Sequence, residues 1–242
     1  MIENLKLFLV ALPLVVINSQ TSLAYRIEPH AYAEHSVFAP DIQGVKAVSN
    51  NKVDLIAPTG NSYGSFITKE IWIRIENTGV GEFIENGALA GQWGNWDGSG
   101  FYPFTGHFYG YRYCDGTGNS NCTTYYGNPY VNNPPPGYNA YEIRKIGSTW
   151  YVITDGNIIS STPFSNYQNG KRGDVGIESS DTDFSFVSGT ALYNYSVRLG
   201  DYNEFVVASG IYNTDYNTYN GMRSAFSYNS ATNENAISLY HN

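Results

Sequence analysis

The sequence predicts an all-β protein built around one hydrophobic core. Short segments of alternating apolar and polar residues recur along the chain, separated by clusters of Gly, Asn, Asp and Pro. The 22 tyrosines and many threonines suit half-buried, pleated surfaces, while charged residues make up only 14% of the chain. No stretch after residue 24 has a sustained helical period. This pattern is typical of a β-sandwich or barrel, and neither a linker nor an internal repeat indicates two domains.

The first 24 residues have the pattern of a secretory signal peptide. A short head is followed by an apolar run over residues 7–17, and Ser22 and Ala24 put small residues at the usual −3 and −1 positions, so we expect cleavage after Ala24. The apolar run is shorter than the roughly 20 residues that span a bilayer. We therefore expect a secreted, extracellular protein without a membrane segment after cleavage; the alternative is an uncleaved N-terminal anchor.

Composition narrows the classes of partner and cofactor. The formal net charge is −8, and no basic stripe exists to neutralise phosphates, which argues against nucleic acid. The four histidines are scattered without metal-ligand spacing, so we expect no metal and no cofactor. Cys114 and Cys122 close a polar loop, and in a secreted chain two cysteines most simply form one disulfide.

The order of elements follows from periodicity and turn residues. Residues 25–45 lack pattern and are expected to form an extended lead-in to a single β-sandwich domain over residues 46–242. Residues 67–75 and 80–90 are expected to pair as a hairpin, and residues 210–220 to be irregular. Further strands are expected at residues 52–57, 105–113, 138–146 and 149–154 (a second hairpin), 158–159, 172–179, 184–187, 191–199, 204–208, 223–229 and 236–240.

Two of these strands each contain a glutamate on a defined face. In residues 80–90, period two places Glu85 on the same face as Phe83, Gly87 and Leu89, and Gly87 leaves room for a neighbouring backbone or a ligand. In residues 172–179, Val175 and Ile177 share one face, and Glu178 lies on the other with Asp174 and Gly176. The preceding strand, 67–75, separates in the same way into an isoleucine face and a face with Thr68, Glu70, Trp72 and Arg74.

If the fold brings Glu85 and Glu178 together, their chemistry is specific. Two close carboxylates resist ionising together, so one retains a proton while the other acts as a general base on water. The protonated partner then donates to the substrate, which gives acid-favoured hydrolysis without a metal. The simpler interpretation is that each glutamate is a solvated residue on the outer face of a strand.

Several short motifs occur in an order known from one family. Residues 83–87 resemble an Ile-Glu-x-Gly segment, and residues 109–122 resemble an aromatic strand followed by a Gly-Cys-x-Asn-x-x-Cys loop. Residues 149–156 resemble a Trp-Trp strand and its turn, and residues 176–178 resemble a Gly-Gly-Glu segment. In this order the chain resembles the neprosin domain and, more remotely, the glutamic peptidase-like proteins.

This resemblance implies a concanavalin-like jelly-roll sandwich of two antiparallel sheets and a secreted acid endopeptidase that hydrolyses extracellular polypeptides. It implies Glu85 and Glu178 as the catalytic pair, with Glu178 as our choice for the general base and Glu85 as proton donor and oxyanion stabiliser. We expect Trp72 and Trp93 to line the substrate groove. Gln92, in the Gly- and Trp-rich loop expected after the strand, is a further candidate because a Gln/Glu pair serves in related glutamic peptidases.

The chain also departs from the family pattern. Ala88 stands where the first motif has tryptophan, and Ile177 stands where the second usually has glycine. A sandwich that keeps the scaffold without peptidase activity is therefore the alternative. It would be a non-catalytic extracellular module that binds polysaccharide through its aromatic residues, or a structural surface protein.

Overall fold

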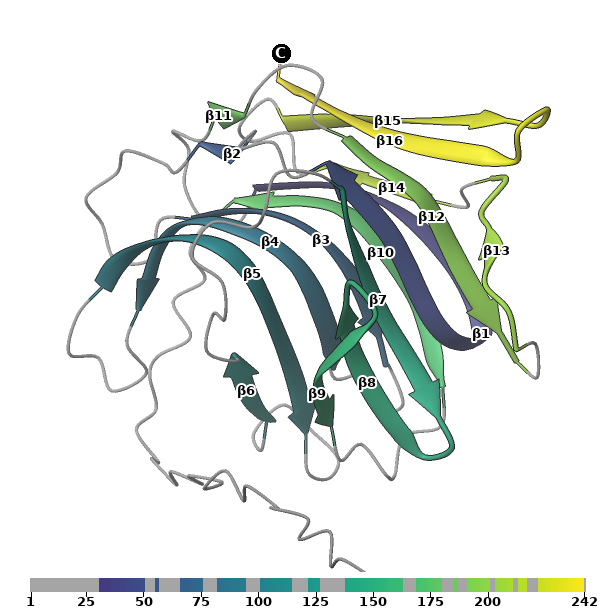
Figure 1. Ribbon diagram of the computed structural model, residues 1–242, viewed down its shortest axis with the longest axis horizontal. Helices are drawn as coiled ribbons and strands as arrows, with labels where there is room; N and C mark the ends of the chain where they lie inside the picture. The colour runs from purple at the N-terminus through teal and green to yellow at the C-terminus, as the bar shows by residue number, and fades with distance from the viewer. Residues whose placement is uncertain are drawn as a thin grey trace, which may run out of the picture.

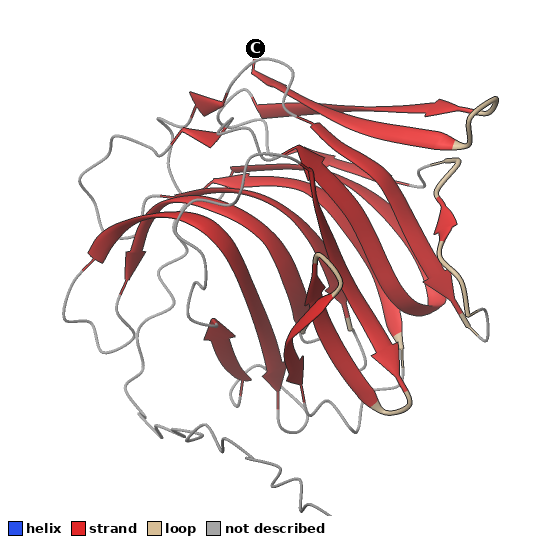
Figure 2. Cartoon of the chain, viewed as in Figure 1, coloured by secondary structure: helices blue, strands red, loops and turns tan. Residues whose placement is uncertain are grey.

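A computed structural model describes residues 31–50, 55–56, 66–75, 82–94, 101–114, 122–126, 138–162, 169–179, 185–186, 191–200, 203–210, 213–216 and 222–241. Every regular element in these ranges is a β-strand (Figure 2). The strands are β1 (Ala31–Asn50), β2 (Leu55–Ile56), β3 (Phe66–Arg74), β4 (Phe83–Gly94), β5 (Phe101–Cys114), β6 (Cys122–Tyr126), β7 (Tyr138–Ile146), β8 (Thr149–Thr154), β9 (Asn157–Thr162), β10 (Gly170–Ser179), β11 (Ser185–Phe186), β12 (Ala191–Leu199), β13 (Val206–Val207), β14 (Asn213–Tyr216), β15 (Met222–Asn229) and β16 (Glu234–His241).

The long strand β1 belongs to both layers of the molecule. Its first half pairs with β10 and β14, and its second half pairs with β7 and β12, with an irregular register between Phe38 and Ile42. One layer therefore has the order β14-β1-β10-β3-β4-β5-β6, and the other the order β15-β16-β12-β1-β7-β8-β9 (Figure 1). All of these pairings are antiparallel, and the chain folds as a concanavalin-like jelly-roll sandwich.

The hydrophobic core lies between the two layers. The isoleucine face of β3 and the Val175–Ile177 face of β10 are fully buried there, as the period-two pattern predicts. Side chains of β7 and β8 meet them from the other layer, and these include Tyr141 and Trp150. At about 25 cal/mol per Å² of apolar surface, this shared core is the main favourable contribution to folding.

A buried asparagine connects the layers through hydrogen bonds. Asn86 of β4 points into the core and has no exposed surface. Its Nδ2 donates to the carbonyl oxygens of Ile153 at 2.9 Å and Glu142 at 3.3 Å, and its Oδ1 accepts from Thr154 Oγ1 at 3.3 Å. Because consecutive residues alternate faces, fixing Asn86 toward the core directs its neighbour Glu85 to the opposite face of the layer.

Both expected hairpins are confirmed as the antiparallel pairs β3–β4 and β7–β8. Residues 31–45, expected as a lead-in, form most of β1 at the centre of the sheet, so the sandwich includes them. Residues 213–216, within a segment expected to be irregular, form β14. The signal segment lies outside the described residues. No helix among the described residues is long and apolar enough to cross a membrane.

Strands β3 and β4 approach each other unusually closely at Gly87. A Cβ atom at this position would lie 2.2 Å from the carbonyl oxygen of Lys69 and 2.6 Å from Cβ of Glu70. The space that the sequence suggested beside Gly87 is therefore occupied by the neighbouring strand. Only glycine permits this contact without moving the backbone.

We expect Gly87→Ala to reduce the free energy of unfolding by about 1–3 kcal/mol or more, because the methyl group would collide with the backbone of β3. The matched control is Gly210→Ala, because no atom lies within 4 Å of a Cβ there. Urea unfolding of both variants measures the difference. Equal stability of the two variants would contradict the close approach of β3 and β4.

Candidate active site

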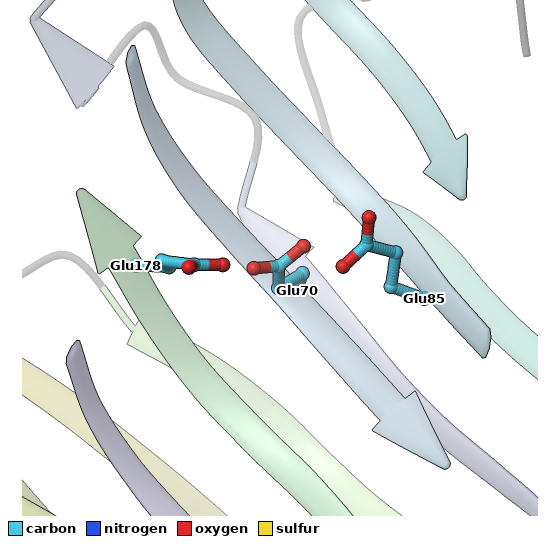
Figure 3. Close-up of side chains that lie close together, drawn as sticks. All are labelled: Glu70, Glu85 and Glu178. Carbon is cyan, nitrogen blue, oxygen red and sulfur yellow. The ribbon is translucent and has the colours of Figure 1, made fainter. Parts of the chain in front are cut away.

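Three adjacent strands place three glutamates on one face of the sheet. In the register of β3 with its neighbours, Glu85 of β4 lies opposite Trp72, and Glu178 of β10 lies opposite Thr68. Glu70 lies on β3 midway between those two positions. The three glutamates therefore form a diagonal row across β4, β3 and β10 (Figure 3). Their face of the sheet is the one opposite to the face that packs in the core.

The carboxyl groups of these glutamates gather at one point. One carboxylate oxygen from each of Glu70, Glu85 and Glu178 lies within 4.8 Å of the other two, with Glu70 in the middle (Figure 3). Glu70 is 0% and Glu85 5% exposed, whereas Glu178 is only partly buried. Glu178 is thus the member of the cluster that solvent reaches most readily.

Glycines make this gathering possible. The residues directly opposite Glu70 are Gly87 on β4 and Gly176 on β10. Neither has a side chain to separate Glu70 from its diagonal neighbours, which lie at the distance that long side chains span across a sheet. The predicted pair therefore meets, and a third carboxyl group lies between its members.

Burial changes the acidity of Glu85. Loss of solvation raises the pKa of Glu85 to about 8, and the charge of Glu178 adds to the increase. A hydrogen bond from Trp72 and the positive charge of Arg74 act in the opposite direction but do not restore the ordinary value. Glu85 accordingly retains its proton from acidic pH through neutrality.

Glu70 is perturbed in the same direction. Desolvation raises its pKa well above the ordinary value, and the charges of Glu85 and Glu178 add to this. Thr68 Oγ1 donates to Glu70 Oε1 at 2.8 Å, which opposes the shift, whereas a hydrogen bond with the Glu178 side chain raises the pKa further. Two carboxyl groups can share a hydrogen bond only if one of them holds a proton.

The cluster could also be considered as a cation site. The three oxygens are close enough to surround one ion, but Ca²⁺ prefers six to eight oxygen ligands. The Thr68 hydroxyl, which lies beside the cluster, already donates to Glu70. We interpret the three residues as a proton-sharing group, and the absence of a metal remains a prediction.

A second cluster of charged side chains lies on the same face, and in it the negative charge of Asp174 is paired with positive charges. Asp174 of β10 is fully buried and accepts hydrogen bonds from Arg172 Nε at 2.6 Å, Arg74 Nε at 2.8 Å and Ser36 Oγ at 2.5 Å. Two guanidinium groups and a hydroxyl satisfy this carboxylate, so Asp174 is a structural ion-pair partner. The glutamate cluster differs in that three carboxyl groups lie together, and the charge of Arg74 only partly offsets the burial of Glu85.

The other predicted site residues lie as follows. Trp72 is 7% exposed, and its hydrogen bond with Glu85 makes it a support for that side chain. Gln92 and Trp93 lie within β4, which continues to Gly94; the expectation of a loop there was wrong. Their side chains lie outside the described residues.

The cysteines occupy directly opposed positions. Cys114 and Cys122 are partners in the antiparallel pairing of β5 with β6. Such partners lie roughly 4.5–5.5 Å apart at Cα, within the range that a disulfide spans. Their side chains lie outside the described residues, and the disulfide remains a prediction.

No motif in the sequence marks Glu70 as a site residue. The alternation of β3 placed it on the polar face with Trp72, but nothing local distinguished it from a solvated residue. The feature that could have indicated Glu70 is Gly87, which lies opposite it in the β3–β4 hairpin. A glycine at that position leaves the glutamate side chain unobstructed.

Comparisons with known proteins give only distant similarities. No protein-family model matches the chain, and no curated protein matches it. Among solved structures, the chain is similar to a β-glucanase from Bacillus licheniformis, with a TM-score of 0.37 and 12% identity over 71% of this chain and 79% of that one. It is also similar to LamAcat from Zobellia galactanivorans, with a TM-score of 0.35 and 10% identity over 88% and 68%.

A third similar structure is the Crh5 transglycosylase, with a TM-score of 0.30 and 12% identity. The match covers 60% of this chain and spans 56% of the transglycosylase. Scores this low carry no argument about activity. None of these matches is to a neprosin-like protein or a glutamic peptidase, so membership of that family remains a proposal.

The raised pKa of Glu85 predicts a pH-dependent difference in stability between the wild type and Glu85→Gln. Below the unfolded pKa near 4.5, Glu85 is neutral in both states. As pH rises toward 8, only the unfolded chain releases this proton, so the wild type loses stability relative to the variant by about 1.4 kcal/mol per pH unit. Thermal unfolding from pH 4 to 8 measures this, with exposed Glu204→Gln as control. A difference independent of pH would contradict the burial of a protonated Glu85.

Proposed function

We propose that the protein is a hydrolase that cleaves peptide bonds of extracellular polypeptides at acidic pH, with Glu178 and Glu85 as its catalytic residues. The observation that carries this proposal is the convergence of the two carboxyl groups from β10 and β4, with oxygens within 4.8 Å. The motifs around both residues resemble those of glutamic peptidases, which supports the choice of substrate.

The difference in burial supports the division of roles. Glu178 is the more accessible of the two, so a water molecule can approach it and be activated by its ionised form. Glu85 is nearly inaccessible, and its pKa of about 8 keeps a proton available for donation. The accessible residue can thus serve as the base and the buried one as the acid.

The reaction would proceed in two steps. As the water oxygen bonds to the carbonyl carbon, Glu178 takes a proton from the water and Glu85 gives its proton to the carbonyl oxygen. In the second step the C–N bond breaks, Glu178 returns its proton to the leaving nitrogen, and Glu85 recovers a proton from a hydroxyl of the intermediate. Both residues end in their starting states, and no covalent intermediate forms.

A second candidate function is the binding or cleavage of a polysaccharide. The favouring observation is that two aromatic side chains, Trp72 and Phe108, lie beside the glutamates on the same face, although both are buried in this structure. An acid–base pair of carboxyl groups also serves in glycosidases. Because inverting enzymes need carboxyl groups roughly 6.5–9.5 Å apart, this pair would fit the retaining arrangement.

The test compares hydrolysis of casein and of peptides at about pH 3–5, near ordinary carboxyl pKa values. Glu178→Gln removes the base and is expected to lower kcat/KM by about 10²–10⁴-fold. Glu85→Gln is expected to lower it less than Glu85→Leu, because an amide still donates a hydrogen bond to the oxyanion. Glu204→Gln is the control, and EDTA is expected to leave the rate unchanged.

Wild-type rates in both the Glu85→Leu and Glu178→Gln variants would contradict the proposed pair. The same proteins are incubated with β-glucan and carrageenan. Cleavage of a polysaccharide with retention, lost in the same variants, would support the second function. Binding without cleavage that survives in both variants would identify a non-catalytic module.

A further inference from the structure

We propose that Glu70 is the positioning residue of the site: it lies between Glu85 and Glu178, is held by Thr68, and shares a proton with Glu178 so that the Glu178 carboxylate stays ionised and oriented toward water. No motif marks Glu70, and the inference rests on the proposed hydrolytic function of its two neighbours.

The position of Glu70 is determined by the fold on every side. It is fully buried on the middle strand of the three, with Gly87 and Gly176 directly opposite it. A Cβ atom at Gly87 would lie 2.6 Å from the Cβ atom of Glu70, so the neighbouring strand packs against the start of this side chain. The side chain therefore extends over the face of the sheet toward its two diagonal neighbours.

Hydrogen bonds determine the orientation of the carboxyl group. Thr68 Oγ1, on the same strand and itself buried, donates to Glu70 Oε1 at 2.8 Å. No hydroxyl or N–H donor among the described residues reaches Glu70 Oε2. One carboxyl oxygen of Glu178 lies within 4.8 Å of one of Glu70, and two carboxyl groups this close can hydrogen-bond each other only if one of them holds a proton. Because Glu70 is the more deeply buried, the proton resides mainly on Glu70 and the charge on Glu178.

Charged groups face Glu70 from each neighbouring strand. By register, the acidic residues on its side of the described sheet are Glu85 on β4 and Glu178 and Asp174 on β10. The basic residues on that side are Arg74 on β3, Arg172 on β10 and Arg112 on β5. Glu34 of β1 is the register partner of Gly176. Arg74 and Arg172 pair with Asp174 at 2.8 and 2.6 Å. Three ionised glutamates in contact would strongly repel each other, so the proton on Glu70 limits the charge of the cluster.

Two substitutions separate the proposed role from simple packing. Glu70→Gln keeps the shape and a hydrogen-bond donor for Glu178, whereas Glu70→Leu keeps approximate volume but removes the donor. We expect Glu70→Gln to leave the acidic limb of the pH profile of kcat/KM where it is in the wild type. Glu70→Leu is expected to move that limb to higher pH by about one unit or more, because the ionised Glu178 loses a charge-assisted hydrogen bond. Thr68→Val removes the anchor and is expected to move the limb in the same direction.

The same shift is expected without substrate, in the titration of the ¹³C-labelled Glu178 carboxyl carbon. The inference would be overturned if Glu70→Leu and the wild type had the same pH profile of kcat/KM. It would also be overturned if Glu70→Gln and Glu70→Leu moved the acidic limb by the same amount. If Glu70→Leu does not fold, Thr68→Val decides: no shift in that variant overturns the proposal.

The outcome is separable from that of the proposed function. Loss of activity in Glu178→Gln with an unchanged profile in Glu70→Leu would refute only the role of Glu70. Wild-type activity in Glu178→Gln would refute the catalytic pair, and the carbon titration would still report whether Glu70 donates to Glu178.

Discussion

The close approach of β3 to β4 at Gly87 is the constraint on which the glutamate cluster depends. It brings the strand with Glu70 against the strand with Glu85, and the missing side chain leaves Glu70 unobstructed. Asn86, the preceding residue, is held by carbonyl groups of the second layer, so the face that each residue of β4 occupies is determined from the core side. The consecutive residues Glu85, Asn86 and Gly87 thus position the acid, fix the strand and admit the neighbouring carboxyl group.

This packing brings buried carboxyl groups close together, which changes the free energy of ionising them. Glu70 and Glu85 are almost entirely removed from water, and the nearby guanidinium groups of Arg74 and Arg172 donate hydrogen bonds to Asp174. Loss of solvation raises the pKa of both groups and, at Glu85, outweighs the positive charge of Arg74, so both remain protonated far above their ordinary pKa. The hydrophobic core between the layers contributes the folding free energy that offsets the cost of burying these carboxyl groups. The proposed hydrolysis at acidic pH uses these bound protons.

Local pattern predicted much of this structure, and its failures have identifiable physical causes. Period two grouped the residues of β3, β4 and β10 into faces correctly, and the register between these strands then puts Glu85 and Glu178 on the same side as Trp72. Strand β1 was not recognised because its core-facing residues do not alternate strictly: Val37 precedes the irregularity, Ile42 follows it with the opposite parity, and Val45 and Ala47 return to the first. Glu70 was missed because its role depends on the register of β3 with β10, strands about 100 residues apart whose alignment no local turn determines.

The three glutamates have identical chemistry, so any difference in their roles must come from the structure around them. Exposure provides one difference, since Glu178 is the only member of the cluster that is not deeply buried. Hydrogen bonding provides another: Trp72 supports Glu85, Thr68 supports Glu70, and Glu70 in turn bonds Glu178. A proton entering the cluster is therefore most stable on the buried members, and negative charge is most stable where water can reach it. That ordering agrees with the proposed roles, in which the accessible Glu178 is the base and the buried Glu85 is the proton donor.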